Sequence, residues 1–198
     1  SLSIPLGIAL ALGRQSDMPI IKWICVFFIE FIRGVPLITL LFVANVILAF
    51  FFPPGTSLDL ILRVLIMMTF FNAAYIAEVV RGGLAALSKG QYEAADSLGL
   101  SYWRSMRLII LPQALKAVIP GIVNTFIGLF KDTTLVLIIG LLDLLGMVNA
   151  AIADPNWSIR SVPTTGYAFV AITFFIFCYG MSRYSRFIEE KLNTGHKR

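Results

Sequence analysis

The sequence predicts an all-α protein that crosses a membrane several times, because a low charge content and long apolar segments occur together. Of the 198 residues, 58% are hydrophobic and 14% are charged, and the mean hydropathy is +0.86. A soluble domain of this size carries about a quarter charged residues. The formal net charge of +5 does not indicate nucleic-acid binding, because the cations lie between and after the apolar segments, where orientation in a membrane requires them.

Apolar segments follow one another along the chain, separated by turn residues such as those at 53–57 and 154–156. We expect them at Ser1–Gly13, Ile20–Phe52 with an interruption at 33–36, Leu60–Val80, Ala114–Phe130, Leu135–Ala153 and Gly166–Met181. The first covers only about 20 Å, which is short of the ~30 Å hydrocarbon core of a bilayer. We therefore interpret it as the inner end of a truncated first helix.

Basic residues determine the expected orientation. They cluster at 14–22, 81–116 and 183–198, and the positive-inside rule places these three regions in the cytoplasm. An even number of crossings must then separate the second cluster from the third, although three apolar segments lie between them. We expect Leu135–Ala153 not to cross, because a re-entrant or interfacial segment tolerates the polar and small residues that it contains, namely Gly140, Asp143, Gly146 and Asn149.

The expected topology therefore has five crossings, with the amino end outside and the carboxyl end in the cytoplasm. We predict a single transmembrane domain over residues 1–198 that carries a cytoplasmic loop at 81–113 and a basic cytoplasmic tail at 183–198.

Catalysis and metal binding are not indicated by the sequence. Its single histidine, His196, lies in the tail, and Cys25 and Cys178 lie in separate apolar segments without metal-ligand spacing. There is no phosphate-binding loop of the G-x-x-x-x-G-K-[ST] type. We expect no catalytic residue, metal or cofactor in this chain.

The cytoplasmic loop is predicted to be folded. Gln91–Leu98 has the pattern of a short helix with Glu93 in its first turn, where the helix dipole favours a carboxylate. Ala94 and Ala95 are small, so the surface of a partner can approach closely. Tyr92 shares a helical stripe with Ala95.

Two further residues define the limits of the loop helices. Gly99 suits a left-handed cap at the end of the first helix, and Ser101 is placed to cap a second helix at 102–111. Pro112 is expected to end or bend that second helix.

These residues carry a resemblance to a known family. Glu93-Ala94-Ala95 with Gly99, followed by Ile109-x-Leu111-Pro112, is similar to the EAA motif of ABC-type importer permeases. The segments 31–37, 77–83 and 131–135 further resemble the polar amino-acid uptake branch, and most closely the general L-amino-acid permeases of proteobacteria.

The resemblance implies a type I importer permease fold in a bacterial inner membrane, forming half of a translocation pathway for amino acids of broad range. It implies three protein partners: an ATPase subunit that uses ATP and Mg, a second permease subunit that is a related heteromeric partner, and a periplasmic amino-acid-binding protein. The EAA loop would be the coupling helix that docks the ATPase, with Tyr92, Glu93, Ala94, Ala95, Gly99, Leu111 and Pro112 as the docking residues.

Two Glu–Arg pairs lie at the same expected depth. Counting about 20 residues inward from Phe52 and from Asp59 brings Glu30 with Arg33, and Glu78 with Arg81, to the cytoplasmic level. Each pair has the i,i+3 spacing that permits pairing on its own helix. One interpretation is interfacial snorkelling of the arginines; the other is a cytoplasmic gate whose pairs exchange partners.

Polar residues inside the spans are candidate substrate ligands, because burying them in a membrane is costly. An amide supplies both a donor and an acceptor for a zwitterion. The candidates are Asn72, Tyr75, Asn124, Lys131, Asp132 and Thr133. Hydrogen bonding between helices is the alternative role for each of them.

Alternative functions make different predictions. A permease for a narrower polar or charged amino acid would share every feature above. A secondary transporter or channel would need inverted repeats or ionisable residues at the midplane, and a membrane-anchored scaffold would need no polar residue deep in its spans.

Overall fold

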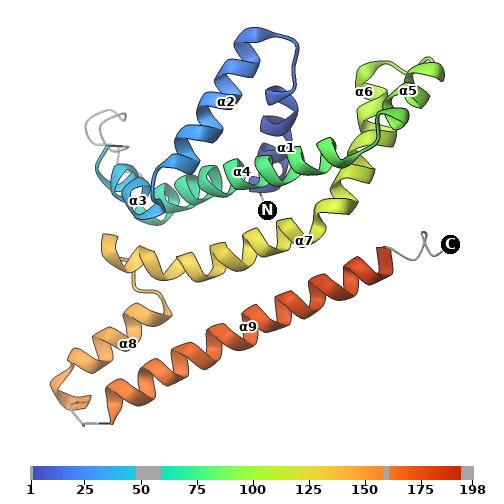
Figure 1. Ribbon diagram of the computed structural model, residues 1–198. Helices are drawn as coiled ribbons and strands as arrows, with labels where there is room; N and C mark the ends of the chain where they lie inside the picture. The colour runs from blue at the N-terminus through green and yellow to red at the C-terminus, as the bar shows by residue number, and fades with distance from the viewer. Residues whose placement is uncertain (1, 48–58, 158–160, 193–198) are drawn as a thin grey trace. The chain divides into compact units, whose positions relative to one another are not determined.

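The computed structural model describes residues 2–47, 59–157 and 161–192, and every regular element in this part of the chain is a helix (Figure 1). The all-α prediction is thus confirmed for the described residues. The predicted turn at 53–57 and residues 193–198 of the predicted tail lie outside them.

The α-helices are α1 (Ser3–Arg14), α2 (Pro19–Gly34), α3 (Leu37–Val46), α4 (Leu60–Ala86), α5 (Lys89–Ser97), α6 (Tyr102–Ser105), α7 (Leu111–Asp132), α8 (Leu144–Ala153) and α9 (Val162–Leu192). A π-helical stretch, Met106–Ile110, joins α6 to α7, and 3₁₀ helices occupy Thr133–Ile139 and Pro155–Trp157.

Three of the described helices are long and apolar enough to cross a membrane: Leu60–Ala86, Tyr102–Ile139 and Val162–Leu192. The pair α2 and α3 passes the same test together but is bent by 105° at the predicted interruption. α1 and α8 are shorter apolar helices. The protein is therefore polytopic, while the number of five crossings stays a prediction.

The helix that contains Pro112 does not end there, which excludes one of the two effects expected of this proline, an end or a bend. It runs from Tyr102 to Ile139 without a break, and Pro112 is the second residue of α7. The helix is wider in the π-helical stretch before Pro112, where hydrogen bonds span five residues. This local irregularity accommodates the proline, which has no N–H to donate. Next to it, the side-chain amide of Gln113 donates to the Ile109 carbonyl at 3.0 Å.

The segment 135–153, which we expect not to cross the membrane, is not a single helix. The 3₁₀ helix ends at Gly140, whose φ of 88° is in the left-handed region. Asp143 then caps α8, its Oδ1 accepting the Gly146 N–H at 2.9 Å.

The chain divides into two compact units. One consists of Ser1–Gly34, Phe70–Thr125 and Ser185–Arg198, and the other of Val35–Thr69 and Phe126–Tyr184. The division passes through α4, α7 and α9.

Glycines set the close packing of the first unit. A Cβ on Gly7 of α1 would lie 2.7 Å from Cγ2 of Ile76 on α4. A Cβ on Gly83 of α4 would lie 2.8 Å from the Ala114 carbonyl oxygen of α7, and a Cβ on Gly121 would lie 2.9 Å from Val79 Cγ1. The backbones of α4 and α7 therefore touch where only glycine fits.

The second unit combines aromatic packing with a few polar bonds. The Phe130 ring lies 5.1 Å from that of Phe174, joining α7 to α9. Tyr167 on α9 donates to the Asn149 side chain of α8 at 3.0 Å. On α9, Phe169, Ile172 and Phe175 are all more than half exposed. Such an apolar outer face fits a helix in contact with lipid.

Candidate functional site

The helix α5 ends in the glycine cap that the sequence predicts. Gly99 has a φ of 67°, its N–H donates to the Asp96 carbonyl at 2.9 Å, and the Leu100 N–H donates to the Ala95 carbonyl at 3.3 Å. These two bonds form a Schellman motif, which satisfies carbonyls that the helix end would otherwise leave exposed. The cap fixes the angle at which the chain leaves α5.

The helix begins two residues earlier than expected. Ser88 has an extended backbone and α5 starts at Lys89, so that Glu93 lies in the second turn rather than the first. The expected interaction of Glu93 with the helix dipole is therefore wrong, because that effect falls off within the first turn.

The two sides of α5 differ in burial. Ala95 is fully buried, and the Tyr92 hydroxyl donates to the Leu84 carbonyl of α4 at 3.3 Å. Burial raises the pKa of Tyr92. Glu93 and Ala94 are exposed. Ala95 thus packs against its own chain and is not available to a partner, in contrast to the prediction.

An apolar residue that sequence reasoning missed extends the exposed side. Leu98, just before the glycine cap, is 73% exposed and offers an apolar side chain at the end of α5. Its position between Ser97 and Gly99 inside the motif was the available signal.

The loop is attached firmly to the helix that follows it. The Gln113 amide donates to Gln91 Oε1 at 2.9 Å, which joins the start of α7 to α5. Leu111 is partly buried beside it and Pro112 is exposed. α5 is therefore linked to the Tyr102–Ile139 helix by a side-chain hydrogen bond as well as through the backbone.

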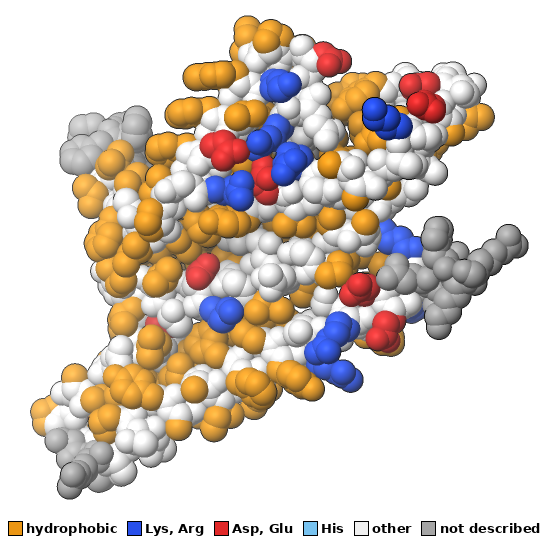
Figure 2. Space-filling model, in the orientation of Figure 1, with side chains coloured by type: hydrophobic (Ala, Val, Ile, Leu, Met, Phe, Trp, Pro, Cys, Tyr) orange, Lys and Arg blue, Asp and Glu red, His pale blue; other side chains and the backbone are white. Residues whose placement is uncertain are grey.

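A cluster of ion pairs joins three helices of the same unit. Arg14 Nη1 lies 2.6 Å from Glu78 Oε1 and 3.0 Å from Glu30 Oε1. The second oxygen of Glu78 lies 3.0 Å from Arg81 Nη2 and 3.7 Å from Arg33 Nη1. We call Arg14, Glu30, Arg33, Glu78 and Arg81 the ion-pair cluster. Figure 2 shows charged side chains of both signs gathered in this region.

The ion-pair cluster agrees with the predicted pairs only in part. Glu78 pairs with Arg81 on its own helix, as the i,i+3 spacing predicts. Glu30 instead pairs with Arg14, and Arg33 with Glu78, so both ion pairs connect different helices. The carboxylate of Glu78, 16% exposed, is the centre of the cluster.

Arg14 was not among the predicted site residues. It was counted only as a cytoplasmic charge, although it ends α1 just where α2 turns back beside it. With Arg14 the cluster has three guanidinium groups and two carboxylates, so it carries one surplus positive charge.

The cluster also contacts one predicted substrate ligand. The Arg33 guanidinium carbon lies 5.6 Å from the centre of the Tyr75 ring, one turn before Glu78 on α4. The neighbouring Phe71 ring lies 4.8 Å from that of Tyr75. Tyr75, a predicted substrate ligand, and Arg33, a predicted gate residue, therefore lie against each other.

The remaining substrate candidates are distributed over both units. Asn72 on α4 is 3% exposed, whereas Asn124 on α7 is exposed. Lys131, Asp132 and Thr133 lie in the other unit. The Thr133 hydroxyl donates to the Phe130 carbonyl at 2.7 Å, which commits its proton to the local backbone. Within the described residues, no group of three His, Cys, Asp or Glu side chains could hold a metal ion.

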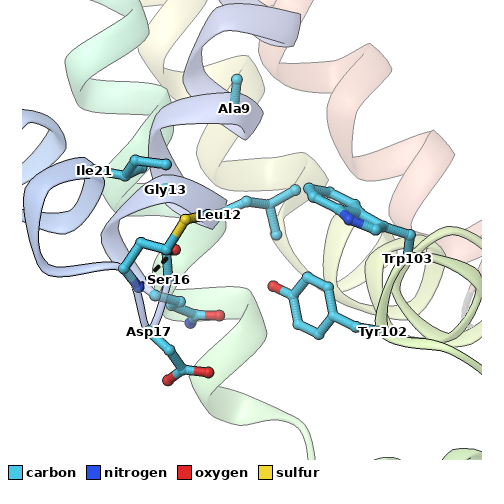
Figure 3. A pocket seen from close by; sticks show the side chains of 10 residues that line it. Ala9, Leu12, Gly13, Ser16, Asp17, Ile21, Tyr102 and Trp103 are labelled. Carbon is cyan, nitrogen blue, oxygen red and sulfur yellow. Dashed lines mark hydrogen bonds between the residues drawn. The ribbon is translucent and has the colours of Figure 1, made fainter.

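A cavity of about 580 Å³ lies in the first unit, between the α1–α2 turn and the start of α6 (Figure 3). Ala9, Leu12 and Gly13 form its wall on α1, and Tyr102 and Trp103 form the opposite wall. The cavity thus lies beside the segment that follows α5.

Comparison with known proteins identifies the class of protein. Residues 3–193 match the family of binding-protein-dependent transport system inner membrane components. The chain belongs to this family, as the EAA resemblance predicted.

Two relatives are similar over almost the whole chain. Glutamate/glutamine/aspartate/asparagine transport system permease protein BztC of Rhodobacter capsulatus is 61% identical over 99% of this chain and 45% of its own length. Inner membrane amino-acid ABC transporter permease protein YhdY of Escherichia coli is 58% identical over 98% of this chain and 52% of its own length. The chain thus spans about half the length of these relatives.

The fold is similar to that of solved transporters. The crystal structure of an amino acid ABC transporter with histidines aligns with a TM-score of 0.81 and 28% identity, over 96% of this chain and 85% of that one. A chain of the MetNI methionine ABC transporter aligns with a TM-score of 0.68 and 21% identity, over 94% of this chain and 86% of that one, which shows the fold alone.

Proposed function

We propose that this chain is a permease subunit of an ATP-driven importer for amino acids of broad range, including the acidic amino acids and their amides. The observation that carries the proposal is the exposed side of α5, held at a fixed angle by the Gly99 cap. Family membership and the amino-acid transport named for BztC and YhdY support it. The narrower alternative is import of one polar or charged amino acid.

In this proposal α5 is the coupling helix, and a separate ATPase subunit docks on it. Glu93 offers a carboxylate for a charge-assisted bond to a partner arginine, Ala94 allows close approach, and Leu98 supplies an apolar contact. Tyr92 and Ala95 hold the helix to its own chain from behind. The remaining partners are a related second permease subunit and a periplasmic amino-acid-binding protein.

The proposed topology places the amino end of this segment in the periplasm, the carboxyl end in the cytoplasm and α8 in a segment that does not cross. Bent or interrupted helices support a re-entrant arrangement because their exposed backbone groups need protein around them. Labelling of single cysteines by an impermeant reagent in intact cells tests it. Labelling at Gln91 from outside the cell would contradict the cytoplasmic loop.

The ion-pair cluster is proposed as a cytoplasmic gate that opens by exchange of partners around Glu78. Arg33 and Arg81 are only partly buried and can leave Glu78 while Arg14 stays bound. Exchanging the charges of Glu78 and Arg81 preserves the net charge but reverses every contact with Arg14 and Arg33. Unchanged transport in this double variant would exclude the gate.

The experiment for the function uses the native complex in proteoliposomes, with the binding protein and labelled amino acids outside. Uptake of glutamate, glutamine, aspartate and asparagine should require ATP inside. Glu93→Ala should uncouple uptake, whereas Glu189→Ala, at an exposed carboxylate of α9, should not. An intact complex whose uptake ignores ATP would refute an importer of this class and favour a secondary transporter or channel.

A further inference from the structure

The cavity beside α6 has an apolar part and a polar end. Leu12, Ile21 and the ring of Trp103 line the apolar part. The polar end is formed by the α1–α2 turn, where Gln15, Ser16 and Asp17 lie. Figure 3 shows the Tyr102 and Trp103 rings directed toward α1 and this turn. A ligand that fits must therefore be amphipathic.

The polar end carries groups suited to a zwitterion. Among the described residues, Asp17 is the one charged residue that lines the cavity, so it favours a cation. The Ser16 hydroxyl oxygen accepts the Met18 N–H at 3.2 Å, which leaves its own proton to be donated to an anionic oxygen. The Gln15 amide is a second donor. A carboxylate and two donors within three successive residues suit an ammonium linked to a phosphate.

An exposed apolar face of α2 begins next to the lining residue Ile21. Ile20 and Ile24 are 73% and 54% exposed. Beyond them, the exposed rings of Trp23, Phe27 and Phe31 stack along the helix at spacings of 5.5 and 5.8 Å. An apolar surface on which an acyl chain can lie is therefore next to the cavity in sequence, because Ile20 adjoins the lining residue Ile21.

The surroundings of the cavity suit lipid headgroups. Tyr102 and Trp103 lie at the start of the Tyr102–Ile139 helix, and both residue types concentrate at membrane–water interfaces. Lys22 and Arg104 are exposed neighbours in sequence of the lining residues Ile21 and Trp103, and their charges suit a phosphate-rich layer.

We propose that this cavity is a binding site for one aminophospholipid of the cytoplasmic leaflet. The acyl chain lies between Leu12 and Trp103, the ammonium pairs with Asp17, and Ser16 and Gln15 donate to the phosphate. The bound lipid braces α6 against the α1–α2 turn, and α6 follows the α5 cap by only a few residues. The site is independent of which amino acid the protein carries.

Tryptophan fluorescence tests this proposal, because bromine on a lipid chain quenches a ring that it touches. Trp103 and Trp23 are 69% and 67% exposed, so contact with bulk lipid should quench them equally. Two forms of the complex, each keeping one tryptophan within residues 1–198, are compared in vesicles with a minor fraction of brominated phosphatidylethanolamine. Tryptophans elsewhere in the complex contribute equally to both forms. One keeps Trp103 and the other keeps Trp23, with phenylalanine at the remaining two positions.

The expected result is that Trp103 is quenched several-fold more strongly than Trp23, and that unbrominated phosphatidylethanolamine reverses the excess. Ala9→Phe, which fills the cavity, should abolish the excess, whereas Ala150→Phe on the exposed surface of α8 should preserve it. Asp17→Asn should reduce the excess quenching of Trp103.

Equal quenching of the two tryptophans would contradict the proposal that the cavity binds a lipid. An equal excess with brominated phosphatidylglycerol would overturn the pairing of Asp17 with the headgroup. Both comparisons use conservative Trp→Phe changes, so they remain informative even if Ala9→Phe does not fold.

Discussion

Arg14 Nη1 lies 2.6 Å from Glu78 Oε1, although the two residues are 64 positions apart in the sequence. This contact ties the end of α1 to the last third of α4, and α4 leads directly into α5. The ion-pair cluster is thus a connection between the α1–α2 hairpin and the proposed coupling helix. Its central member is a carboxylate that three guanidinium groups share.

Glu78→Gln should reduce both stability and transport strongly. The change leaves the charges of Arg14, Arg33 and Arg81 without their shared counterion. The expected loss is at the lower end of the ~3–5 kcal/mol that breaking a buried pair costs, because two of the arginines are partly solvated. Thermal unfolding of the purified complex and ATP-dependent uptake measure the two effects.

Glu30→Gln is the matched control for that change. Glu30 is 55% exposed and its side chain makes one ion pair in the cluster, with Arg14. The same substitution there should cost less than about 1 kcal/mol, as for other solvated pairs. Equal effects at the two positions would mean that Glu78 is not the centre of the cluster.

Gly83→Ala should destabilise the protein, whereas Gly82→Ala should not. A Cβ at Gly83 would lie 2.6 Å from Val118 Cγ1 and 2.8 Å from the Ala114 carbonyl oxygen, while nothing lies within 4 Å of one at Gly82. We expect a cost of about 1–3 kcal/mol at position 83 from overpacking. At position 82 alanine should be neutral or stabilising by up to ~1 kcal/mol. Similar apparent melting temperatures for the two variants would contradict the close contact of α4 with α7.

Gly99→Val should impair the docking of the ATPase subunit. A φ of 67° is strained for a β-branched residue, at a cost of roughly 1–2 kcal/mol, so the α5 cap should rearrange. Gly99→Asn should be tolerated better because asparagine adopts this region more readily. Gly90→Ala, within the same helix but without a positive φ, provides the control. The amount of ATPase that copurifies with each variant is the measurement, and equal recovery from Gly99→Val and Gly90→Ala would contradict the role of the cap.

Asn72→Leu should alter the relative uptake of different amino acids if this amide contacts substrate. Asn72 is 3% exposed, and replacing a buried interhelical amide costs about 0.6–1.7 kcal/mol on its own. Stability alone would lower the uptake of all substrates by the same factor. Competition between glutamine and glutamate distinguishes the two roles, and an unchanged preference would remove Asn72 from the substrate ligands.

The helical class, the loop and its glycine cap were predictable because they depend on local composition and spacing. Three features were not. The side of α5 that carries Ala95 turned inward because Tyr92 reaches the Leu84 carbonyl, a contact between consecutive helices that periodicity cannot orient. Pro112 did not end its helix because the π-helical stretch before it accommodates the missing donor.

The ion-pair cluster was the third feature. The i,i+3 rule identified the Glu78–Arg81 pair, since both residues lie on one helix. Arg14 entered the cluster through the folding of α1 against α2 and α4, and no spacing in the sequence encodes that approach. The net charge of the cluster therefore became visible only with the fold.

The glycine contact between α4 and α7 has a mechanical consequence. The Tyr102–Ile139 helix is continuous, and Gly83 and Gly121 hold it against α4 around Val118. At ~1.5 Å per residue, about 24 Å of helix lies between Tyr102 and Val118. The glycine contact therefore pins this stretch against α4. Pro120, two residues beyond Val118, is the place where α7 can bend on the far side of the contact.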